Sequence, residues 1–277
     1  MLKDLAPDIP IINQCHATGF RQMALCPGIA GEVRNGVRRN DAFVVLHRDH
    51  QQRLCDELNV DPARVHLVGA GYRNELFHSR GRNPTPHPSL LFVGKYSASK
   101  GLPQLLEAVE RLQLSLPNLV LHVAGSGSGN EASGLAARMA LMPSVQLHGQ
   151  LSQEQLAELA RTSWACVLPS FYEGIPLVLV EALACGCRLV ATELPGIKEQ
   201  LQPHLGELMT LIPLPGMIGV DTPDPDEIPH FVDALVDALQ HTLEQPPLDG
   251  PSFQVNLERY TWQSVFEKVE TIWKEQL

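Results

Sequence analysis

The sequence holds few basic residues, no Cys-x-x-Cys pair and no long apolar run. Its 277 residues include 21 Lys and Arg against 31 Asp and Glu, a formal net charge of −10. This balance argues against a protein that coats nucleic acid, because phosphate affinity comes mainly from clustered Lys and Arg. No apolar run approaches the ~20 residues that span a bilayer, and the first residues lack the apolar stretch of a signal peptide. We therefore expect at most peripheral contact with a membrane.

The six cysteines are scattered along the chain without a Cys-x-x-Cys pair. A chain of this length buries a core without disulfide or metal staples. Cysteines in this arrangement are typical of reduced thiols in a cytoplasmic protein. The composition therefore predicts a cytoplasmic globular protein.

From residue 90 onward, short apolar runs alternate with segments of helical periodicity. The apolar runs predict buried strands at 90–93, 120–124, 145–148, 165–168 and 189–191. The segments between and after them predict helices at 102–112, 134–141, 152–161 and 176–184. Alternation at this spacing is typical of right-handed βαβ units. The expected fold class is therefore α/β, with one complete, doubly wound parallel sheet.

Residues 1–80 predict only part of a second sheet. Strand-like runs at 9–13, 43–46 and 65–68 accompany a helix at 49–58. These make about two βα units, whereas sheets usually have ~5–6 strands. The Pro-rich segment 80–88 is typical of a connection between domains.

Beyond residue 203 the pattern is less regular. An irregular stretch at 212–229 precedes a predicted helix at 230–243, and a final amphipathic helix follows. The apolar stripe of that helix consists of Trp262, Val265, Phe266, Val269, Ile272, Trp273 and Leu277. We interpret the stripe as a contact with the core.

Residues 171–191 carry the most informative motif, directly after a predicted strand. The motif therefore lies at the C-terminal edge of the sheet, where open α/β sheets bind ligands. Gly174 permits a tight turn, and Pro176 suits the first position of a helix. Backbone amides near Leu177 and Val178 would then form an anion site, supported by the helix dipole.

Two carboxylates, Glu173 and Glu181, frame this anion site. A carboxylate beside a phosphate repels it unless the carboxylate faces hydroxyl groups instead. A sugar nucleotide supplies both groups, with a ribose diol for one acid and sugar hydroxyls for the other. From spacing alone, the pair can also be a helix-start Glu that complements the dipole and a second Glu that is merely solvated.

A second cluster, at residues 91–101, is a strand, a glycine turn and two lysines before a helix. Its chemical groups are the Gly94 turn and the Lys95 and Lys100 ammonium groups. Ammonium groups at a helix N-terminus can neutralise a diphosphate. Lysines in surface turns are also commonly just solvated, so this cluster alone indicates little.

Together, the two clusters resemble the family 4 retaining glycosyltransferases of GT-B fold. That family has Glu-x-Gly-x-Pro, a second Glu eight residues after the first, and a small-residue helix ending in Gly. The matching residues are Glu173, Gly174, Pro176, Glu181, Ala182, Ala184 and Gly186. The family's phosphate strand reads Val-Gly-Arg with a following Lys-Gly, matched by Val93, Gly94, Lys95, Lys100 and Gly101. Lys95 keeps the charge of the usual Arg but not its bidentate fork.

The resemblance implies a retaining, nucleotide-sugar-dependent transferase of the hexosyltransferase type. Glu181 would bind the ribose hydroxyls, and Glu173 those of the donor sugar. Lys95 and Lys100 would hold the diphosphate, which as leaving group would deprotonate the acceptor. The family needs no metal, so the resemblance implies no metal and no cofactor beyond a UDP- or GDP-linked sugar substrate. The acceptor, whether a glycan, a lipid or a small molecule, stays open.

Residues 16–21 resemble the family's His-Gly-Thr-Asp segment, whose His reaches the donor sugar. The resemblance therefore adds His16 to Glu173, Lys95 and Lys100 as a catalytic residue. The strand at 145–149 resembles the family's base-contacting segment. The implied donor-binding residues are Arg21, Gly94, Leu147, Gly174, Ile175, Pro176, Leu177, Val178 and Glu181.

The same resemblance divides the chain into three parts. Residues 1–72 would be the remnant of an N-terminal, acceptor-side Rossmann-like domain, 73–258 the nucleotide-sugar-binding domain, and 259–277 a helix that crosses back. A full first domain would need roughly 100 further residues before Met1, which a second chain could supply. Two alternatives therefore stand beside the enzyme: a non-catalytic or truncated nucleotide-sugar-binding subunit that needs a partner chain, and a nucleotide-sugar epimerase.

Overall fold

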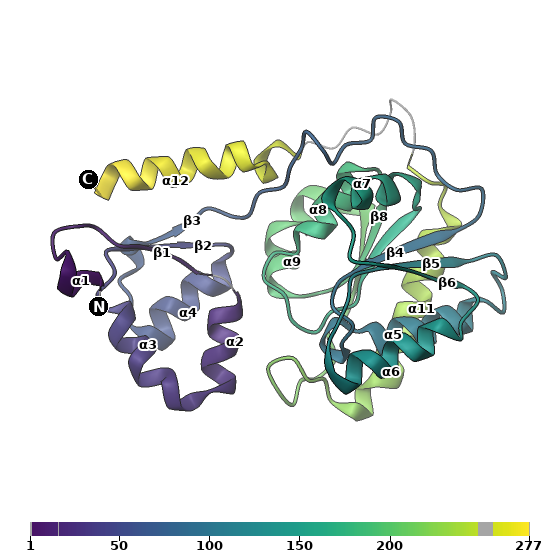
Figure 1. Cartoon of the computed structure of the whole chain (residues 1–277), viewed down its shortest axis with the longest axis horizontal. Helices are drawn as coiled ribbons and strands as arrows, with labels where there is room; N and C mark the ends of the chain where they lie inside the picture. Colours follow the sequence, from purple (N-terminus) through teal and green to yellow (C-terminus); the bar gives the residue numbers. More distant parts are fainter. Residues whose placement is uncertain (1, 16, 249–256, 277) are drawn as a thin grey trace.

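The computed structural model describes residues 2–15, 17–248 and 257–276, which form two parallel β-sheets with helices on their faces (Figure 1). The smaller sheet has the order β1-β2-β3, with β1 at Ile12–Cys15, β2 at Ala42–Val45 and β3 at Val65–Leu67. The larger sheet has six strands in the order β6-β5-β4-β7-β8-β9. Its strands are β4 Ser89–Val93, β5 Val120–Ala124, β6 Val145–Gly149, β7 Ala165–Leu168, β8 Arg188–Thr192 and β9 Met209–Ile212. The predicted α/β class with parallel sheets is confirmed.

The order of the larger sheet reverses between β4 and β7. The chain runs outward from β4 to β6 on one side, then returns to β7 and runs outward to β9 on the other. Leu90 and Leu91 of β4 pair with Ala165 and Cys166 of β7 at this reversal. Open α/β sheets bind ligands at such a switch point, beyond the carboxyl ends of the strands. The two loops that leave β4 and β7 therefore define the place to examine for a site.

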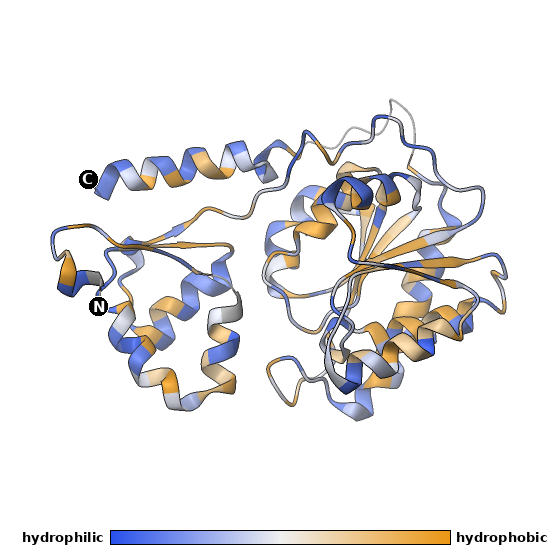
Figure 2. Ribbon diagram, viewed as in Figure 1, coloured by the Kyte–Doolittle hydropathy of each residue, from blue (hydrophilic) through white to orange (hydrophobic). Residues whose placement is uncertain are grey.

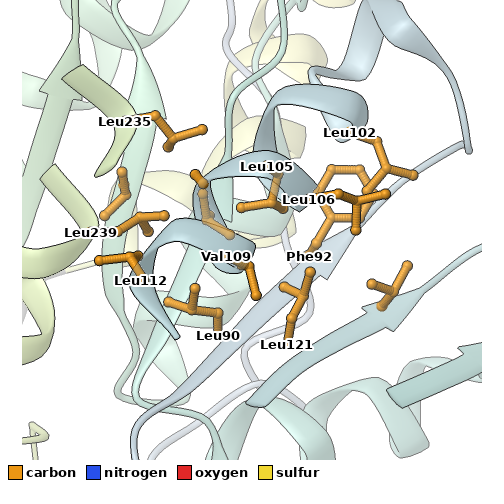
Figure 3. Packing of buried hydrophobic residues seen from close by; sticks show 14 of the residues in the cluster. Leu90, Phe92, Leu102, Leu105, Leu106, Val109, Leu112, Leu121, Leu235 and Leu239 are labelled. Carbon is orange, nitrogen blue, oxygen red and sulfur yellow. The ribbon is translucent and has the colours of Figure 1, made fainter. Parts of the chain in front are cut away.

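Successive residues of β4 pack into different layers of helices. Leu90 and Phe92 contact the layer formed by α5 (Leu102–Leu112), α6 (Gly129–Ala140) and α11 (Ile228–Glu244), as Figure 3 shows for α5 and α11. Leu91 contacts the opposite layer, which includes α7 (Gln153–Thr162) and α8 (Leu177–Ala184). A sheet buried on both faces requires apolar residues throughout each strand. Figure 2 shows this concentration of apolar residues along the strands.

Several helix ends differ from the predicted ones. Pro176 does not begin α8 but precedes it as the N-cap residue, in an extended conformation with φ −76° and ψ 97°. The helix predicted at 134–141 begins earlier, at Gly129 of α6. The helix predicted at 230–243 likewise extends to Ile228–Glu244 of α11. Prolines and glycines at helix starts explain these shifts, because they interrupt the apolar periodicity without ending the helix.

Gly186 ends α8 in the left-handed conformation, with φ 95°. The Cys187 amide donates to the Ala182 carbonyl at 2.9 Å, and the Gly186 amide donates to the Leu183 carbonyl at 2.8 Å. These bonds satisfy carbonyls that the end of the helix leaves free. A Cβ atom on Gly186 would lie 2.5 Å from the Cδ atom of Arg82. Both the conformation and the space therefore require glycine here.

We expect Gly186→Ala to lower the free energy of unfolding by about 1–2 kcal/mol or more, because a Cβ strains the left-handed conformation and displaces Arg82. Urea denaturation measures this loss. The control is Gly134→Ala, which lies inside α6 with no atom within 4 Å of the new Cβ. That variant should gain about 0.5–1 kcal/mol from helix propensity. Equal stability of Gly186→Ala and the parent would contradict this account of α8.

The small sheet is covered on one face by α2 (Ala17–Leu25), α3 (Ala30–Val37) and α4 (Arg48–Leu58), and on the other by α12 (Trp262–Gln276) (Figure 1). Phe43 and Val45 pack toward α2 and α4. Val44 packs toward Ile272 of α12. The C-terminal helix thus crosses back to the first sheet, although it follows the second sheet in sequence.

The apolar stripe of α12 is only partly a core contact. Val265 and Ile272 are buried, whereas the side chains of Trp262, Phe266 and Trp273 are 39%, 57% and 53% exposed. The interpretation of the stripe as a core contact is therefore wrong for these three aromatic residues. A sheet of three strands is too narrow to cover the whole stripe, and Trp262 stacks on Phe266 instead, with ring centroids 5.3 Å apart. Leu277, the last residue of the stripe, lies outside the described residues.

The chain passes between the two sheets twice, and the two passages lie side by side. Tyr72 in the first passage pairs in parallel with Thr261 in the second. The Tyr72 amide donates to the Tyr260 carbonyl at 2.8 Å, and the Trp262 amide donates to the Tyr72 carbonyl at 3.3 Å. A Cβ on Gly71 would lie 2.8 Å from the Cα of Trp262, so the passages approach too closely for a side chain there.

Other elements depart from the sequence prediction. The strand predicted at 9–13 begins only at Ile12, because a turn closes before it, with the Ile9 amide donating to the Ala6 carbonyl at 3.3 Å. Helices α2 and α3 and strand β9 were not predicted at all. Short further helices are α1 (Leu2–Leu5), α9 (Pro195–Gln200) and α10 (Gln202–Leu205). Among the helices of the described residues, none is both long enough and apolar enough to cross a membrane.

Candidate functional site

A cavity of about 540 Å³ lies at the switch point of the larger sheet. Its floor comes from the loops after β4 and β7. Further residues come from the loop before α11 and from the first lobe, which we define as the small sheet with α2, α3, α4 and α12; the larger sheet with its helices is the second lobe. The lining residues named by the sequence prediction are Arg21, Gly94, Lys95, Lys100, Glu173, Gly174 and Ile175. The fold therefore brings together two motifs that lie more than 70 residues apart in the chain.

An ion pair joins the two motifs across the cavity. The Lys100 ammonium donates to Glu173 Oε1 at 2.5 Å, and the two side chains are 24% and 15% exposed. Lys95 lines the same cavity and has no hydrogen bond or ion pair with any described residue. Of the two lysines in the cavity, Lys95 is thus uncommitted and Lys100 is held by a carboxylate. An anion in the cavity could pair with the Lys95 ammonium without first breaking an existing ion pair.

Two glycines allow the loops beside the cavity to approach one another closely. Gly101 has φ 65°, and a Cβ there would collide with the Pro169 carbonyl oxygen of the β7 loop. Gly125 has φ 139°, and a Cβ there would collide with the Gly94 carbonyl oxygen. The Gly125 amide donates to the Gly149 carbonyl at 2.7 Å. The glycines after β4 and β5 therefore serve backbone packing, as expected for a glycine turn at a strand end.

A second cavity, of about 640 Å³, adjoins the first and shares Gly94 and Lys95 with it. It is lined by the glycine loop after β5 and by residues after β6, among them Gln150 and Leu151. Leu147, the predicted base contact, is 43% exposed on the edge strand β6 and does not line either cavity. Together, the two cavities, which share Gly94 and Lys95, follow the C-terminal ends of β4, β5 and β7.

Glu181 lies in the second turn of α8, outside both cavity linings. Burial raises the pKa of its carboxyl to about 7. No described residue donates a hydrogen bond to this carboxylate. A desolvated carboxylate without a donor is an acceptor for a ligand that brings hydroxyl groups. Pro176, Leu177 and Val178, at the start of the same helix, also lie outside the linings.

Arg21 connects the first lobe to the second. Its Nε and Nη2 atoms donate to Asp221 Oδ2 at 2.9 and 2.5 Å. The guanidinium group is therefore committed to a carboxylate, although it lines the cavity. His16, predicted as a catalytic residue, lies outside the described residues. The segment that follows it forms α2, in which a Cβ on Gly19 would meet no atom within 4 Å.

The cavity also contains polar residues that sequence reasoning did not select. Ser97 and Ser99 share a hydrogen bond of 3.0 Å and lie within the lysine cluster already noted, so their position could have suggested them. Tyr172 lies inside the glutamate motif and has its pKa raised by burial. Asp221 lies within the irregular stretch at 212–229, which has no recognisable motif, so no local signal indicates it.

Residues 73–210, which hold both cavity loops, match the family described as "Glycosyl transferases group 1". This segment is a glycosyltransferase group 1 domain. The match includes the β4 and β7 loops, the Lys100–Glu173 pair and all of α8. The first lobe, apart from its connection to the second sheet, lies outside this group 1 domain.

Similar curated proteins extend beyond the group 1 domain. The glycogen synthase of Mycobacterium tuberculosis is 24% identical over 270 residues, which is 93% of this chain and 61% of that protein. The D-inositol 3-phosphate glycosyltransferase of Geodermatophilus obscurus is 30% identical over 216 residues, which is 69% of this chain and 48% of that protein. The chain thus spans about half to three fifths of the length of these relatives.

Solved structures share the arrangement of the group 1 domain and the first lobe. Sucrose-phosphate synthase from Thermosynechococcus elongatus superposes with a TM-score of 0.70 at 20% identity, over 95% of this chain and 67% of that one. Anabaena Alr3699/HepE, solved with UDP and glucose, superposes with a TM-score of 0.69 at 14% identity, over 98% and 73% of the two chains. These likenesses show the GT-B fold.

Proposed function

We propose that this chain binds a nucleotide diphosphate sugar at the switch point of its larger sheet and transfers the sugar to an acceptor with retention and without a metal. One observation carries the proposal: Lys95, Lys100 and Glu173 converge in one cavity beside the start of α8. Cations for a diphosphate and a carboxylate for hydroxyl groups are the two kinds of group that such a donor requires.

The Lys100–Glu173 pair links the two halves of donor recognition. A diphosphate that draws Lys100 away from Glu173 leaves that carboxylate free to accept hydrogen bonds from sugar hydroxyls. The Lys100 ammonium exchanges the carboxylate for a phosphate, and the Glu173 carboxylate exchanges the ammonium for hydroxyl groups. Neither side chain is therefore left buried without a partner. The ion pair therefore holds both side chains in place until a donor with both phosphates and a sugar replaces it.

In the proposed reaction, the bond between the sugar and the diphosphate breaks, and the acceptor oxygen bonds to the same face of the sugar. The leaving phosphate oxygen takes the acceptor proton. Lys95 and Lys100 stabilise the negative charge that grows on the diphosphate, and the first-turn amides of α8 add to this stabilisation. Fixed cations in a partly desolvated cavity supply the charge stabilisation that a metal gives elsewhere.

The names of the relatives support sugar transfer without singling out one acceptor. They include a glycogen synthase, an inositol phosphate glycosyltransferase and a mannosyltransferase. Sugar transfer is the activity that these names share, and the proposal is limited to that activity. The first lobe, with Arg21 and Leu46 in the cavity wall, would face the acceptor.

The test is calorimetric titration of the purified chain with UDP, GDP and ADP, each with a chelator present. We expect one nucleotide to bind, and we expect Lys100→Ala to weaken its binding at least about tenfold, because a charge-assisted bond is worth about 1.5–3 kcal/mol. The variant also leaves Glu173 unpaired beside the phosphates, which adds repulsion. Release of the nucleotide from its sugar-linked form in the presence of acceptor extracts then measures transfer.

Lys198→Ala is the matched control for this experiment. Lys198 is an exposed lysine on α9 that pairs with Glu193 outside the cavity, so its loss should leave nucleotide affinity unchanged. The corresponding nucleoside lacks phosphates, so Lys100→Ala and the parent should bind it with similar affinity. Equal diphosphate affinity in Lys100→Ala and the parent would refute the assigned role. Binding without any turnover would favour a binding subunit.

A further inference from the structure

We propose that His47, Asp49 and His50 bind a divalent transition-metal ion of the Zn²⁺ class at the junction between the first lobe and the loop between β7 and α8, called the donor loop below. One ligand atom from each of the three residues lies within 4.8 Å of the other two. None of the three lines the cavity assigned to the donor. The site is therefore separate from the proposed diphosphate site and does not depend on it.

The backbone brings the three side chains together in one helical turn. His47 follows β2 and is the N-cap residue of α4, with extended φ −149° and ψ 169°. Asp49 and His50 are the second and third residues of that helix. Ser, Thr, Asp or Asn usually occupies an N-cap and hydrogen-bonds a first-turn amide. The His47 side chain makes no such bond, so capping does not account for it.

Burial gives the second and independent observation. His47 and His50 are each 2% exposed. Neither ring nitrogen of His47 has a hydrogen-bond partner among the described residues. Buried polar groups in native proteins are almost always bonded to protein, water or an ion. A ring with two buried nitrogens and no partner is therefore placed for a ligand rather than for packing, which an aliphatic side chain would serve better.

The distances and ligand types suit a small tetrahedral ion. The His47 and His50 rings lie with centroids 3.8 Å apart and an interplanar angle of 36°. Zn–N bonds of about 2.0–2.1 Å place tetrahedral ligand atoms about 3.3 Å apart, so small rotamer adjustments suffice. Two imidazoles and one carboxylate leave the fourth position for water. Imidazole ligands favour Zn²⁺ and its first-row neighbours over Mg²⁺ and Ca²⁺.

The charges around the cluster permit a cation. Two bases are near in the chain. Arg48 is exposed to solvent. The Arg53 guanidinium already pairs with Glu57 at 2.7 Å and lies 4.3 Å from the centroid of the Phe20 ring. Asp49 supplies a negative charge in the cluster itself. The charge of Arg53 is thus balanced by Glu57 of the same helix, so Arg53 should repel a metal ion at the three ligands only weakly.

The position of the cluster indicates what a bound ion would do. A Cβ on Gly196 of α9 would lie 3.3 Å from His47 Cδ2 and 2.5 Å from the carbonyl oxygen of Gly174 in the donor loop. Gly196 thus lies between the His47 ring and Gly174 of the donor loop. An ion that fixes His47 would stiffen the contact between α4 of the first lobe and this part of the second lobe.

The test is titration of the chelator-treated full chain with Co²⁺ and then Zn²⁺, without nucleotide. We expect one ion per chain, visible Co²⁺ absorption of a site with nitrogen and oxygen ligands, and its displacement by Zn²⁺. His50→Gln and Asp49→Asn should each weaken Zn²⁺ at least about 100-fold, because even the loss of a residue that supports a ligand costs about 10–100-fold. Asp49 is half-exposed, so Asp49→Asn should fold even if a histidine variant does not.

His122→Gln is the matched control. His122 Nδ1 and His148 Nε2 already form a hydrogen bond of 3.0 Å with each other. Because these two rings are not among the proposed ligands, His122→Gln should leave Zn²⁺ affinity unchanged. Three results would overturn the proposal: no binding at millimolar metal, affinity unchanged in both Asp49→Asn and His50→Gln, or the intense charge-transfer band of a thiolate ligand. The last would place the ion on a cysteine such as the exposed Cys26.

Discussion

Glu181→Gln should unfold at a higher denaturant concentration than the parent at pH 8, and at the same concentration near pH 4. Burial raises the pKa of this carboxyl from 4.5 to about 7 in the folded chain. Folding therefore favours the protonated form. Below the unfolded pKa, both states are protonated and the residue costs nothing, whereas above about pH 7 the folded chain must keep a desolvated charge. The stability cost grows as the pH rises from about 4.5 to about 7.

The size of the effect follows from the shift. One pKa unit corresponds to about 1.4 kcal/mol, so a rise from 4.5 to about 7 gives an upper bound of about 3.5 kcal/mol. Urea denaturation of both proteins at several pH values measures the difference in their free energies of unfolding. The contributions of the other carboxylates are the same in both proteins and cancel in this difference. Glu107→Gln, on the exposed face of α5, is the control and should show no such pH-dependent gain. A constant difference between Glu181→Gln and the parent from pH 4 to 8 would contradict the prediction.

The same variant tests the proposed ribose contact. A carboxylate that accepts ribose hydroxyls must be ionised, so nucleotide binding by the parent should strengthen between pH 5.5 and 8. Glu181→Gln should bind nucleotide more weakly at pH 8 and lose this pH dependence. A stability gain together with unchanged nucleotide affinity would leave the burial argument intact and refute the contact.

Arg82→Met should destabilise the chain by about 3 kcal/mol or more, because each buried acceptor left without its charged donor costs about 1–3 kcal/mol. The Arg82 guanidinium donates to the carbonyls of Ala160, Arg161 and Cys185 at 3.3, 3.2 and 3.1 Å, and to that of Ser163 at 3.0 Å. It also donates to the Leu248 carbonyl. The first four carbonyls lie at or just beyond the ends of α7 and α8, where a helix leaves acceptors without an amide partner of its own ladder. Those of Ala160 and Arg161 also accept from the Ser163 and Asn83 amides. The loss of Arg82 therefore leaves the carbonyls of Ser163, Cys185 and Leu248 most in need of a donor. One side chain thus caps two helices.

Urea denaturation at constant m-value measures the loss. Arg80→Met is the matched control, because Arg80 is exposed in the same connecting segment, and it should change stability little. Arg82→Lys keeps the charge but not the planar fork of donors, so its stability should lie between those of the parent and Arg82→Met. Full stability of Arg82→Met would show that water replaces the guanidinium at these carbonyls.

The sequence predicts the larger sheet well because both of its faces are buried. Strands such as β4 and β7 must then be apolar at every position, and a continuous apolar run is easy to recognise. Strand β9 was missed because it is a half-exposed edge strand of four residues. Helices α2 and α3 were missed because Gly19, Gly31 and Gly36 break their periodicity, and only packing against the small sheet completes them.

The candidate site is predictable where it depends on local motifs at strand ends. Lys100 and Glu173 each lie just after a buried strand, and the carboxyl ends of parallel strands meet at one edge. Asp221 could not be found in this way. It lies 200 residues from Arg21, and their bond depends on how two lobes and a long loop come together. The functional roles of Glu173, Glu181 and the lysines stay predictions until nucleotide binding is measured.

The paired passages at Tyr72 and Thr261 have a mechanical consequence. Two backbone segments that are hydrogen-bonded side by side form a short two-stranded ribbon. Such a ribbon bends more easily perpendicular to its plane than within its plane. We therefore expect motion of one lobe relative to the other to be mainly opening and closing about the paired passages. Arg21 and Asp221, which join the two lobes at the cavity, would then have to separate whenever the lobes open.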